Sequence, residues 1–268
     1  MWDFEHEPRA TELAKCYSII SSTPSECAHH LQRGTADIGL VPVAAYASLP
    51  NAAIVPRCAI ASLDEVRSIL LVVRHSGGVD GVKRVALDTA SITSATYTRI
   101  LFHKLWKNDP EFLPHSADLE AMLDVADAAM LIGDPALLAL EGREERELRT
   151  GERLQYIDLA HEWREWTNTA WVSAFWAVRE DALTRCGILP EQLVEDFERS
   201  RDGGLDHLDQ IVQEWSTRIA LPAQTIRSYL LDNIHYFLDD VCLDGLNLFY
   251  RYAVECGALP TVPKLRFL

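Results

Sequence analysis

One pattern limits the folds open to this chain more than any other: an apolar strand that leads straight into a helix, found twice. Residues 85–87 form a short apolar run, and the apolar residues that follow recur at helical spacing. The pattern returns at residues 128–132, where the apolar run precedes Gly133, Asp134 and Pro135. Asp134 suits the cap position of a helix and Pro135 its first turn. Strands that alternate with helices predict an α/β fold with mainly parallel sheets.

The clearest helix boundaries lie near the N-terminus. Thr23 can cap a helix, Pro24 suits its first turn, and Glu26 can complete a capping box. Gly34 supplies a stop signal. We expect a helix over residues 24–33.

The C-terminal part of the chain is predicted to be helical, because every segment after residue 190 has helical spacing. With 268 residues and 48% hydrophobic composition, the chain can bury a large core and favours two lobes over one. A turn at residues 75–78 and a long strand at residues 171–178 are the expected crossings. We assign residues 1–75 and 177–268 to lobe one and residues 76–176 to lobe two, with a ligand cleft between them.

The charge balance argues against a nucleic-acid partner. The chain has 25 Lys and Arg against 40 Asp and Glu, a formal net charge of −15, whereas phosphate backbones are bound by clustered basic residues. No run reaches the roughly 18 consecutive apolar residues of a membrane helix, so no membrane partner is expected. The charged N-terminus lacks the apolar centre of a signal peptide, and the scattered cysteines are expected to be free thiols. The cytoplasm is the predicted compartment.

A cluster of hydroxyl groups follows the first strand: Thr89, Ser91, Thr93 and Ser94. Such a cluster more commonly caps a helix and is otherwise solvated. In α/β sheets, however, ligands bind outside the carboxyl ends of the strands, and the start of a helix offers unpaired N–H groups to an anion. We therefore predict that Ser91, Thr93 and Ser94 form a carboxylate cradle.

The second strand-to-helix turn could face the same cleft. An aspartate before a proline is most often a structural cap. In the functional interpretation, Gly133 lets a ligand approach the backbone closely and Asp134 orients a substrate hydroxyl.

A tryptophan-rich segment at residues 161–180 could line an aromatic pocket. Its tryptophans are expected mainly in the core and between the lobes. One that faced the cleft would suit a planar six-membered ring, and we choose Trp166 for that position.

The sequence contains no recognisable motif for metal binding, serine-hydrolase catalysis or nucleotide binding. His29 and His30 lie on a predicted helix without metal-ligand spacing, and the other histidines form neither HxxxH nor HExxH. The chain contains no GxSxG, GxGxxG or GxxxxGK segment. A metal site and nucleotide chemistry are therefore not expected.

Six segments stand in a characteristic order: LQRGTADIGLVPVAAY (31–46), VRSILLV (66–72), VALDTASITS (85–94), ADAAMLIGDPAL (126–137), WREWT (163–167) and LDGLNLFYRYAVECGALPTVPKLRF (243–267). In this order and spacing the chain resembles the chorismate dehydratase family, which acts first in the futalosine route of menaquinone biosynthesis. The dihydroxynaphthoate synthase of that route is a close relative. The likeness covers nearly the whole chain.

The resemblance implies a two-lobed fold similar to type 2 periplasmic binding proteins, with the ligand between the lobes and no metal or organic cofactor. It implies that chorismate, a dicarboxylate, loses water to give 3-[(1-carboxyvinyl)oxy]benzoate. By resemblance, the carboxylate contacts are Ser91, Thr93 and Ser94, the cleft residue on the crossing strand is Ser68, and the opposite wall is Gly133-Asp134. No residue stands out as the base, and Asp134 is a candidate by position.

Two departures from the family pattern affect the expected site. Family members usually begin with a strand and an Asn-containing turn that reaches the cleft, whereas this chain opens at Met1-Trp2, about where that turn would end. We therefore expect the usual first strand to be missing, either because the start was assigned too late or because this wall was lost. Residues 167–174 read TNTAWVSA where the family tends to read TGLPFVFA, a change that could alter the ligand.

Two other functions stay open. One is a non-catalytic intracellular protein that binds a small carboxylate. The other is the related dihydroxynaphthoate synthase, which needs a base histidine that no matching motif supplies.

Overall fold

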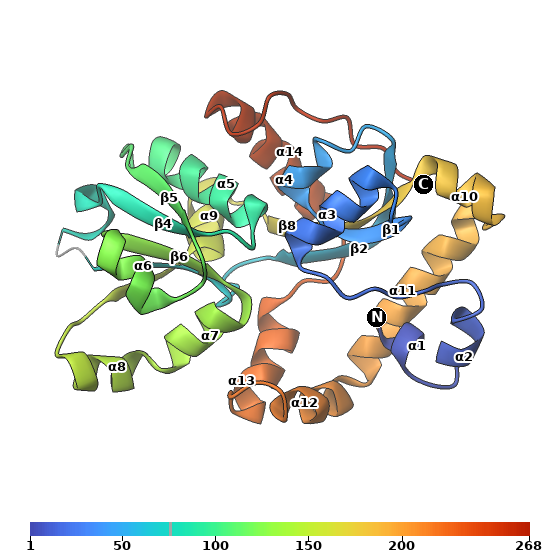
Figure 1. The fold of residues 1–268 in the computed structure, drawn as a ribbon, viewed down its shortest axis with the longest axis horizontal. Helices are drawn as coiled ribbons and strands as arrows, with labels where there is room; N and C mark the ends of the chain where they lie inside the picture. Colours follow the sequence, from blue (N-terminus) through green and yellow to red (C-terminus); the bar gives the residue numbers. More distant parts are fainter. Residues whose placement is uncertain (75–76) are drawn as a thin grey trace.

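The computed structural model describes residues 1–74 and 77–268 and contains two β-sheets surrounded by helices (Figure 1). One sheet has three strands in the order β1-β8-β2, and the other has five in the order β5-β4-β6-β3-β7. The strands are β1 (Ile38–Pro42), β2 (Ala52–Ser62), β3 (Ile69–Val73), β4 (Arg84–Asp88), β5 (Glu111–His115), β6 (Ala128–Ile132), β7 (Gln155–Asp158) and β8 (Trp171–Arg179). Each sheet forms the centre of one lobe.

The three-stranded sheet is antiparallel throughout, with β8 in the middle. It pairs Leu40 with Trp176 on one side and Ile60 with Ala174 on the other. Helices α3 (Pro24–Arg33), α4 (Val43–Tyr46) and α14 (Asp240–Glu255) pack around it. Residues 1–37 form helices and connecting segments, and the first strand of the chain is β1.

The predicted capping box is present at the start of α3. The Thr23 hydroxyl accepts the N–H of Glu26 at 3.4 Å, and the Glu26 carboxylate accepts the N–H of Thr23 at 2.9 Å. Gly34 ends the helix in the left-handed conformation, with a φ of 71°. The predicted helix over residues 24–33 is confirmed.

The five-stranded sheet combines both strand directions. β4 is parallel to β5 and β6, whereas β3 is antiparallel to β6 and β7. Helices α5 (Ile92–Ile100) and α9 (Leu159–Thr167) cover the face that carries Leu71 and Leu87. Helices α6 (Leu119–Val125) and α7 (Gly133–Glu141) cover the face that carries Val72 and Ala86. Both faces are therefore apolar, as expected for buried strands.

The remaining helices lie mainly at the two ends of the chain. They are α1 (Trp2–Glu5), α2 (Ala10–Leu13), α8 (Arg143–Thr150), α10 (Glu180–Cys186), α11 (Pro190–Asp206), α12 (Leu208–Ser216) and α13 (Ala223–Ser228), with the 3₁₀-helix η1 (Gly78–Gly81) and the π-helices η2 (Leu101–Leu105) and η3 (Tyr229–Asn233). The helical C-terminal region is confirmed. It runs from lobe one along α11, turns through α12 and α13 beneath α7, and returns to lobe one in α14 (Figure 1).

The α/β class and the two-lobed arrangement are as predicted, but the expectation of mainly parallel sheets is wrong. Of the six strand pairings in the described residues, two are parallel. β3 and β8 are the strands that follow the crossings between the lobes. Each runs in the direction opposite to its neighbours: β3 is antiparallel to β6 and β7, and β8 is antiparallel to β1 and β2.

Sheet membership also shifts the division into lobes. β3 belongs to the five-stranded sheet and β8 to the three-stranded sheet, whereas the sequence placed β3 in lobe one and most of β8 in lobe two. We therefore propose crossings at residues 63–68 and 168–170. The turn expected at residues 75–78 includes His75 and Ser76, which lie outside the described residues, and η1 begins at Gly78.

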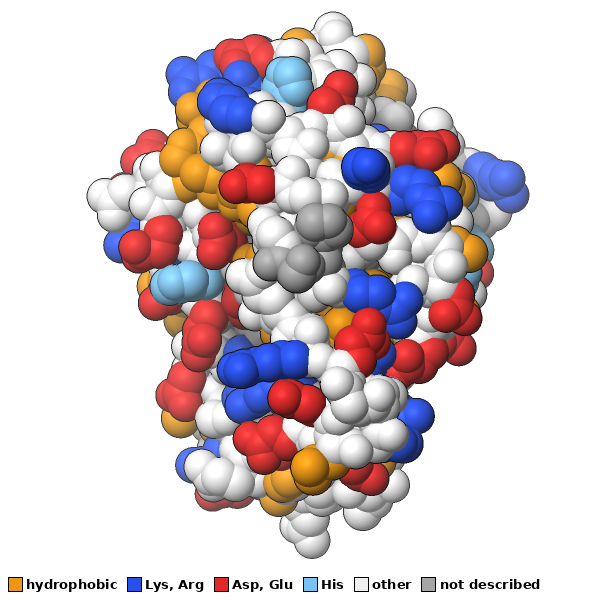
Figure 2. All heavy atoms as spheres, turned by 90° about the vertical axis from the view of Figure 1, so that its left-hand side faces the viewer, with side chains coloured by type: hydrophobic (Ala, Val, Ile, Leu, Met, Phe, Trp, Pro, Cys, Tyr) orange, Lys and Arg blue, Asp and Glu red, His pale blue; other side chains and the backbone are white. Residues whose placement is uncertain are grey.

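The surface carries charges of both signs. Acidic and basic side chains are interspersed on the face that lobe two presents in Figure 2. In the described part of the chain, no helix combines the length and apolar character needed to cross a bilayer. All six cysteines are free, as predicted.

Candidate active site

The predicted site residues of lobe two meet at one edge of its sheet. β4 and β6 are parallel neighbours, so the turns that follow them, which hold Ser91 and Gly133, lie at the same edge. β3 begins at this edge, where the N–H of Gly133 donates to the carbonyl oxygen of Ser68 at 2.7 Å. The sheet therefore brings together three segments that are far apart in sequence.

The hydroxyl cluster is built around the start of α5. Ser91 precedes the helix and caps it, because its Oγ accepts the N–H of Ser94 at 3.0 Å. The Ser91 hydroxyl donates its proton to Ser94 Oγ at 2.9 Å. Thr93 Oγ1 accepts the N–H of Ala44 at 3.2 Å. In these bonds Thr93 and Ser94 act as acceptors, so their own protons can be donated to a ligand.

Lobe one covers this cluster. Thr93 and Ser94 are only 1% and 2% exposed. Ala44 approaches from α4, and the Ser25 hydroxyl at the start of α3 donates to the carbonyl oxygen of Ala90 at 3.1 Å. Thr93 and Ser94 are therefore almost fully shielded from solvent in this structure.

The start of α7 differs from its prediction. The helix begins at Gly133, residue Ile132 precedes it, and no side chain caps it, so Asp134 does not occupy the cap position. Gly133 itself has a φ of 62°, a left-handed conformation that glycine adopts without steric cost at the entry to the helix. Asp134 is exposed, and its carboxylate is left free of a capping role.

Tyr229, the first residue of η3, belongs to the same edge but was not singled out from the sequence. Its hydroxyl donates to Ser68 Oγ at 3.1 Å. Burial raises the pKa of Tyr229 and the negative charge of Asp134 adds to this rise, whereas the hydrogen bond with Ser68 opposes it. The two residues line a cavity of about 190 Å³ whose other walls are mostly apolar. A π-helical turn is a common mark of functional sites, but it cannot be read from residue pattern.

Trp166 does not join the other predicted site residues. Its ring stacks on Tyr252 with centroids 5.3 Å apart and meets Trp163 edge-on at 5.9 Å. Trp163 is fully buried, and Tyr252 lies on α14. In this structure Trp166 packs α9 against α14 and does not face the sheet edge.

The changed segment 167–174 fills the core. Trp171 is fully buried and stacks on Tyr97 with ring centroids 3.7 Å apart. The Tyr97 hydroxyl accepts the N–H of Val172 at 3.3 Å. The bulk added by Trp171 thus packs the start of β8 against Tyr97 of α5.

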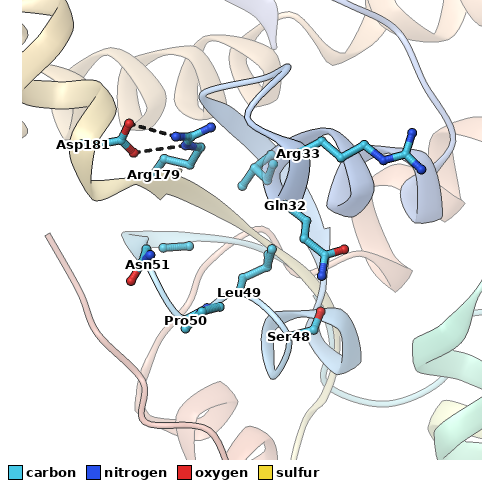
Figure 3. Close-up of a pocket in the computed structure, with 10 residues that line it drawn as sticks. Gln32, Arg33, Ser48, Leu49, Pro50, Asn51, Arg179 and Asp181 are labelled. Carbon is cyan, nitrogen blue, oxygen red and sulfur yellow. Dashed lines mark hydrogen bonds and ion pairs between the residues drawn. The ribbon is translucent and has the colours of Figure 1, made fainter.

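A larger cavity of about 420 Å³ lies on lobe one, at the C-terminal end of α3 (Figure 3). Arg33 points away from it, and Arg179 is paired with Asp181 at 2.8 Å. Its polar lining includes Gln32 and Ser48. None of the predicted site residues contributes to this cavity.

One group of three side chains in the described residues has the chemistry to hold a metal ion. The ligand atoms of His235, Asp239 and Cys242 lie within 4.8 Å of one another. His235 and Asp239 are hydrogen-bonded at 2.8 Å, and the Cys242 thiol donates to the carbonyl oxygen of Phe237 at 3.3 Å. These bonds account for the convergence without an ion. That the protein needs no metal or cofactor stays a prediction.

Two α/β lobes joined by two crossings, with helix starts between them, define a periplasmic-binding-protein-like fold. Solved structures agree. The chain is similar to protein AF1704 from Archaeoglobus fulgidus, with a TM-score of 0.69 and 17% identity over 96% of this chain and 93% of that chain. It is similar to the periplasmic aliphatic sulphonate binding protein SsuA from Escherichia coli, with a TM-score of 0.57 and 16% identity over 91% of this chain and 81% of that chain. At these identities the likeness shows the fold alone.

The sequence comparisons narrow this class to one family. The family described as menaquinone biosynthesis matches residues 2–255, and the chain belongs to it. The chain is also 27% identical over 258 residues to the chorismate dehydratase of Thermus thermophilus, covering 92% of this chain and 89% of the relative.

Proposed function

We propose that this protein is a chorismate dehydratase, a hydro-lyase of menaquinone biosynthesis. Family membership and the Thermus thermophilus relative support this reaction. The structural observation that carries the proposal is the pair of hydroxyl groups on Thr93 and Ser94. Their protons can be donated to a carboxylate at the start of α5, on the sheet edge that also holds Gly133.

The edge suits a dicarboxylate. The first turn of α5 adds backbone N–H groups and the positive end of its dipole to the two hydroxyls. Ser68 offers a further hydroxyl on the far side of Gly133. Two separate groups of donors can therefore hold the two carboxylates of chorismate and fix the ring between them.

The proposed reaction is a 1,2-elimination. A base removes the proton from the ring carbon that carries the enolpyruvyl ether, the electron pair of that C–H bond forms the new ring double bond, and the hydroxyl group on the adjacent ring carbon leaves as hydroxide. The carboxylate delocalises the negative charge, and aromatisation of the ring drives the reaction. Orientation and stabilisation of the developing charge by fixed donors are then the main tasks of the protein.

Asp134 is our candidate for the base. It stands next to Gly133 on the sheet edge, it is exposed, and no capping bond occupies its carboxylate. A carboxylate of the substrate is the alternative proton acceptor. Closure of lobe one over the cluster would exclude water from the reacting ring.

The chemistry of this elimination requires no organic cofactor, and the proposal includes none. It also places the protein in the cytoplasm, in keeping with six free cysteines. The alternatives, a non-catalytic binding protein and the dihydroxynaphthoate synthase, gain no support from the comparisons.

The direct test is incubation of the protein with chorismate, with the ultraviolet spectrum and the mass of the product followed over time. We expect an aromatic product that has lost one water. Asp134→Asn should lower kcat by at least about tenfold if its carboxylate is the base. Thermal stabilisation by chorismate without any product would instead favour the non-catalytic binding protein.

A further inference from the structure

The C-terminal helical segment is hydrogen-bonded to the crossing that leads from lobe one into β3, residues 63–68. This crossing lies just before the sheet edge described above. Three side-chain hydrogen bonds join the two segments: Asn233 Nδ2 to the carbonyl oxygen of Glu65 at 3.2 Å, Arg67 Nη1 to Ser228 Oγ at 3.2 Å, and the Tyr229 hydroxyl to Ser68 Oγ at 3.1 Å. Only the last of these contacts reaches a predicted ligand group.

The Tyr229 hydroxyl is the donor in this contact, 3.1 Å from Ser68 Oγ. A phenol with its ordinary pKa of about 10 keeps its proton at neutral pH. Burial raises the pKa of Tyr229 further, although the hydrogen bond with Ser68 opposes this shift. Ser68 is 5% exposed, and its Oγ receives that proton.

The hydrogen bond from Tyr229 determines in which direction the Ser68 hydroxyl can donate its own proton. A serine hydroxyl has one proton to donate and two acceptor sites. Because Tyr229 occupies an acceptor site, the proton of Ser68 must point elsewhere. The main chain of Ser68 is fixed as well, since its carbonyl oxygen accepts the N–H of Gly133 at 2.7 Å. The hydroxyl is thus held in place as a donor beside Gly133.

We propose that Tyr229 is a positioning residue for the substrate: it orients Ser68 so that the Ser68 hydroxyl donates to a carboxylate bound at this sheet edge. The inference deepens the proposed function and rests on it. It assigns the second carboxylate of the substrate to Ser68, and the first to Thr93 and Ser94. It also gives the C-terminal segment a role in substrate binding.

A purely structural role for Tyr229 would consist of packing η3 against β3. Tyr236 provides the matched control, because it lies seven positions further along the same segment. Its hydroxyl donates to the carbonyl oxygen of Leu230 at 3.0 Å. Tyr236→Phe removes a phenol hydrogen bond from the same part of the chain without touching Ser68.

The test uses five full-length proteins: the natural chain, Tyr229→Phe, Ser68→Ala, the double variant and Tyr236→Phe. Calorimetry gives the Kd for chorismate, and the rate of product formation gives KM and kcat. We expect Tyr229→Phe to raise Kd and KM about five- to tenfold, the effect of one lost hydrogen bond between neutral groups, with kcat changed less than about twofold. Ser68→Ala should do the same, and the double variant should be no worse than Ser68→Ala alone.

Three results would overturn the inference: an unchanged Kd in Tyr229→Phe, effects of the two single variants that multiply in the double variant, or an equal rise in Tyr236→Phe. The proposed function is judged separately, by product formation in the natural chain. If that chain binds chorismate without converting it, the proposed function fails and the Kd values alone decide on Tyr229. If it neither binds nor converts chorismate, both ideas are wrong.

Discussion

The carboxylate of Asp158 accepts the backbone N–H of Arg67 at 2.6 Å and thereby fixes one of the two crossings between the lobes. The same carboxylate accepts the N–H groups of Val66 at 3.0 Å and, on its own side, of Ala160 at 3.0 Å and His161 at 3.1 Å. Arg67 has a φ of 62°, a conformation that costs free energy in a residue with a Cβ. Asp158 stabilises this conformation one residue before Ser68 and so helps to place the sheet edge.

Replacing Asp158 by Asn should destabilise the folded chain by about 2–3 kcal/mol. The amide keeps one acceptor oxygen, but its NH₂ group faces backbone N–H donors that then lose their partner. Urea unfolding measures the loss. As a control, Asp118→Asn changes the cap of α6, whose carboxylate accepts a single N–H, from Ala121 at 3.1 Å. An equal loss in both variants would show that the crossing has no special dependence on Asp158.

The same residue predicts a pH effect. Burial raises the pKa of Asp158 above its ordinary value of 3.8, although its backbone hydrogen bonds oppose the shift. The folded state therefore holds the proton more tightly than the unfolded state. This group makes the free energy of unfolding fall as the pH rises from 3.8 through the folded pKa, and the contribution levels off above it. The natural chain should show this fall relative to Asp158→Asn in urea unfolding between about pH 4 and 7. A difference that stays constant over this range would contradict the raised pKa.

The sequence predicted those parts of the fold and site that depend on neighbouring residues. The helix over residues 24–33 carries its own start and stop signals, and the structure has both. The hydroxyl cluster and Gly133 were found because a strand-to-helix turn is a local pattern, and parallel pairing of β4 with β6 brings two such turns to one edge. A local pattern and one rule of topology were enough to place these two turns at one edge of the sheet.

What the sequence missed depends on contacts between distant segments. The direction of β3 and β8 depends on how the chain crosses between lobes. Tyr229 lies 161 positions from Ser68, and its neighbours in sequence give no sign of that contact. Trp166 stands in a segment that resembles the family, but its side chain is placed by Tyr252 on α14.

Two hydroxyls near the start of α5 should differ in function: that of Ser94 should bind the substrate, and that of Ser91 should cap the helix. Ser94→Ala removes a donor whose proton can reach the ligand, so we expect KM for chorismate to rise about tenfold. Ser91→Ala removes the helix cap and should cost about 1 kcal/mol of stability with a KM within about twofold of the natural value. Steady-state kinetics and urea unfolding on both variants test this contrast. A similar rise in KM for both would mean that Ser91 also contacts the carboxylate, as predicted from the sequence.

Gly133→Ala tests whether Gly133 belongs to the substrate site, and Gly151→Ala is the control. A Cβ at Gly133 would meet no atom within 4 Å, so the cost of Gly133→Ala comes from its φ of 62°. Gly151 shares both properties, with a φ of 68°, but lies at the end of α8. Both alanine variants should lose about 1–2 kcal/mol of stability. Only Gly133→Ala should also raise KM, because it alters the backbone beside Ser68. Equal kinetics in the two variants would remove Gly133 from the site.

Trp166 is the position where the prediction from the sequence and the packing of the structure disagree most directly. If its ring bound the substrate, Trp166→Phe would raise KM. In the structure the ring stacks on Tyr252 and contacts Trp163, so we expect KM to stay within about twofold. The smaller ring should lose about 1 kcal/mol of packing, which lowers Tm by roughly 2–4 °C in a chain of this size. Tyr252→Leu removes the other half of the same stack and should have the same two effects. A rise in KM of fivefold or more in Trp166→Phe alone would return Trp166 to the substrate site, since the packing it shares with Tyr252 could not explain it.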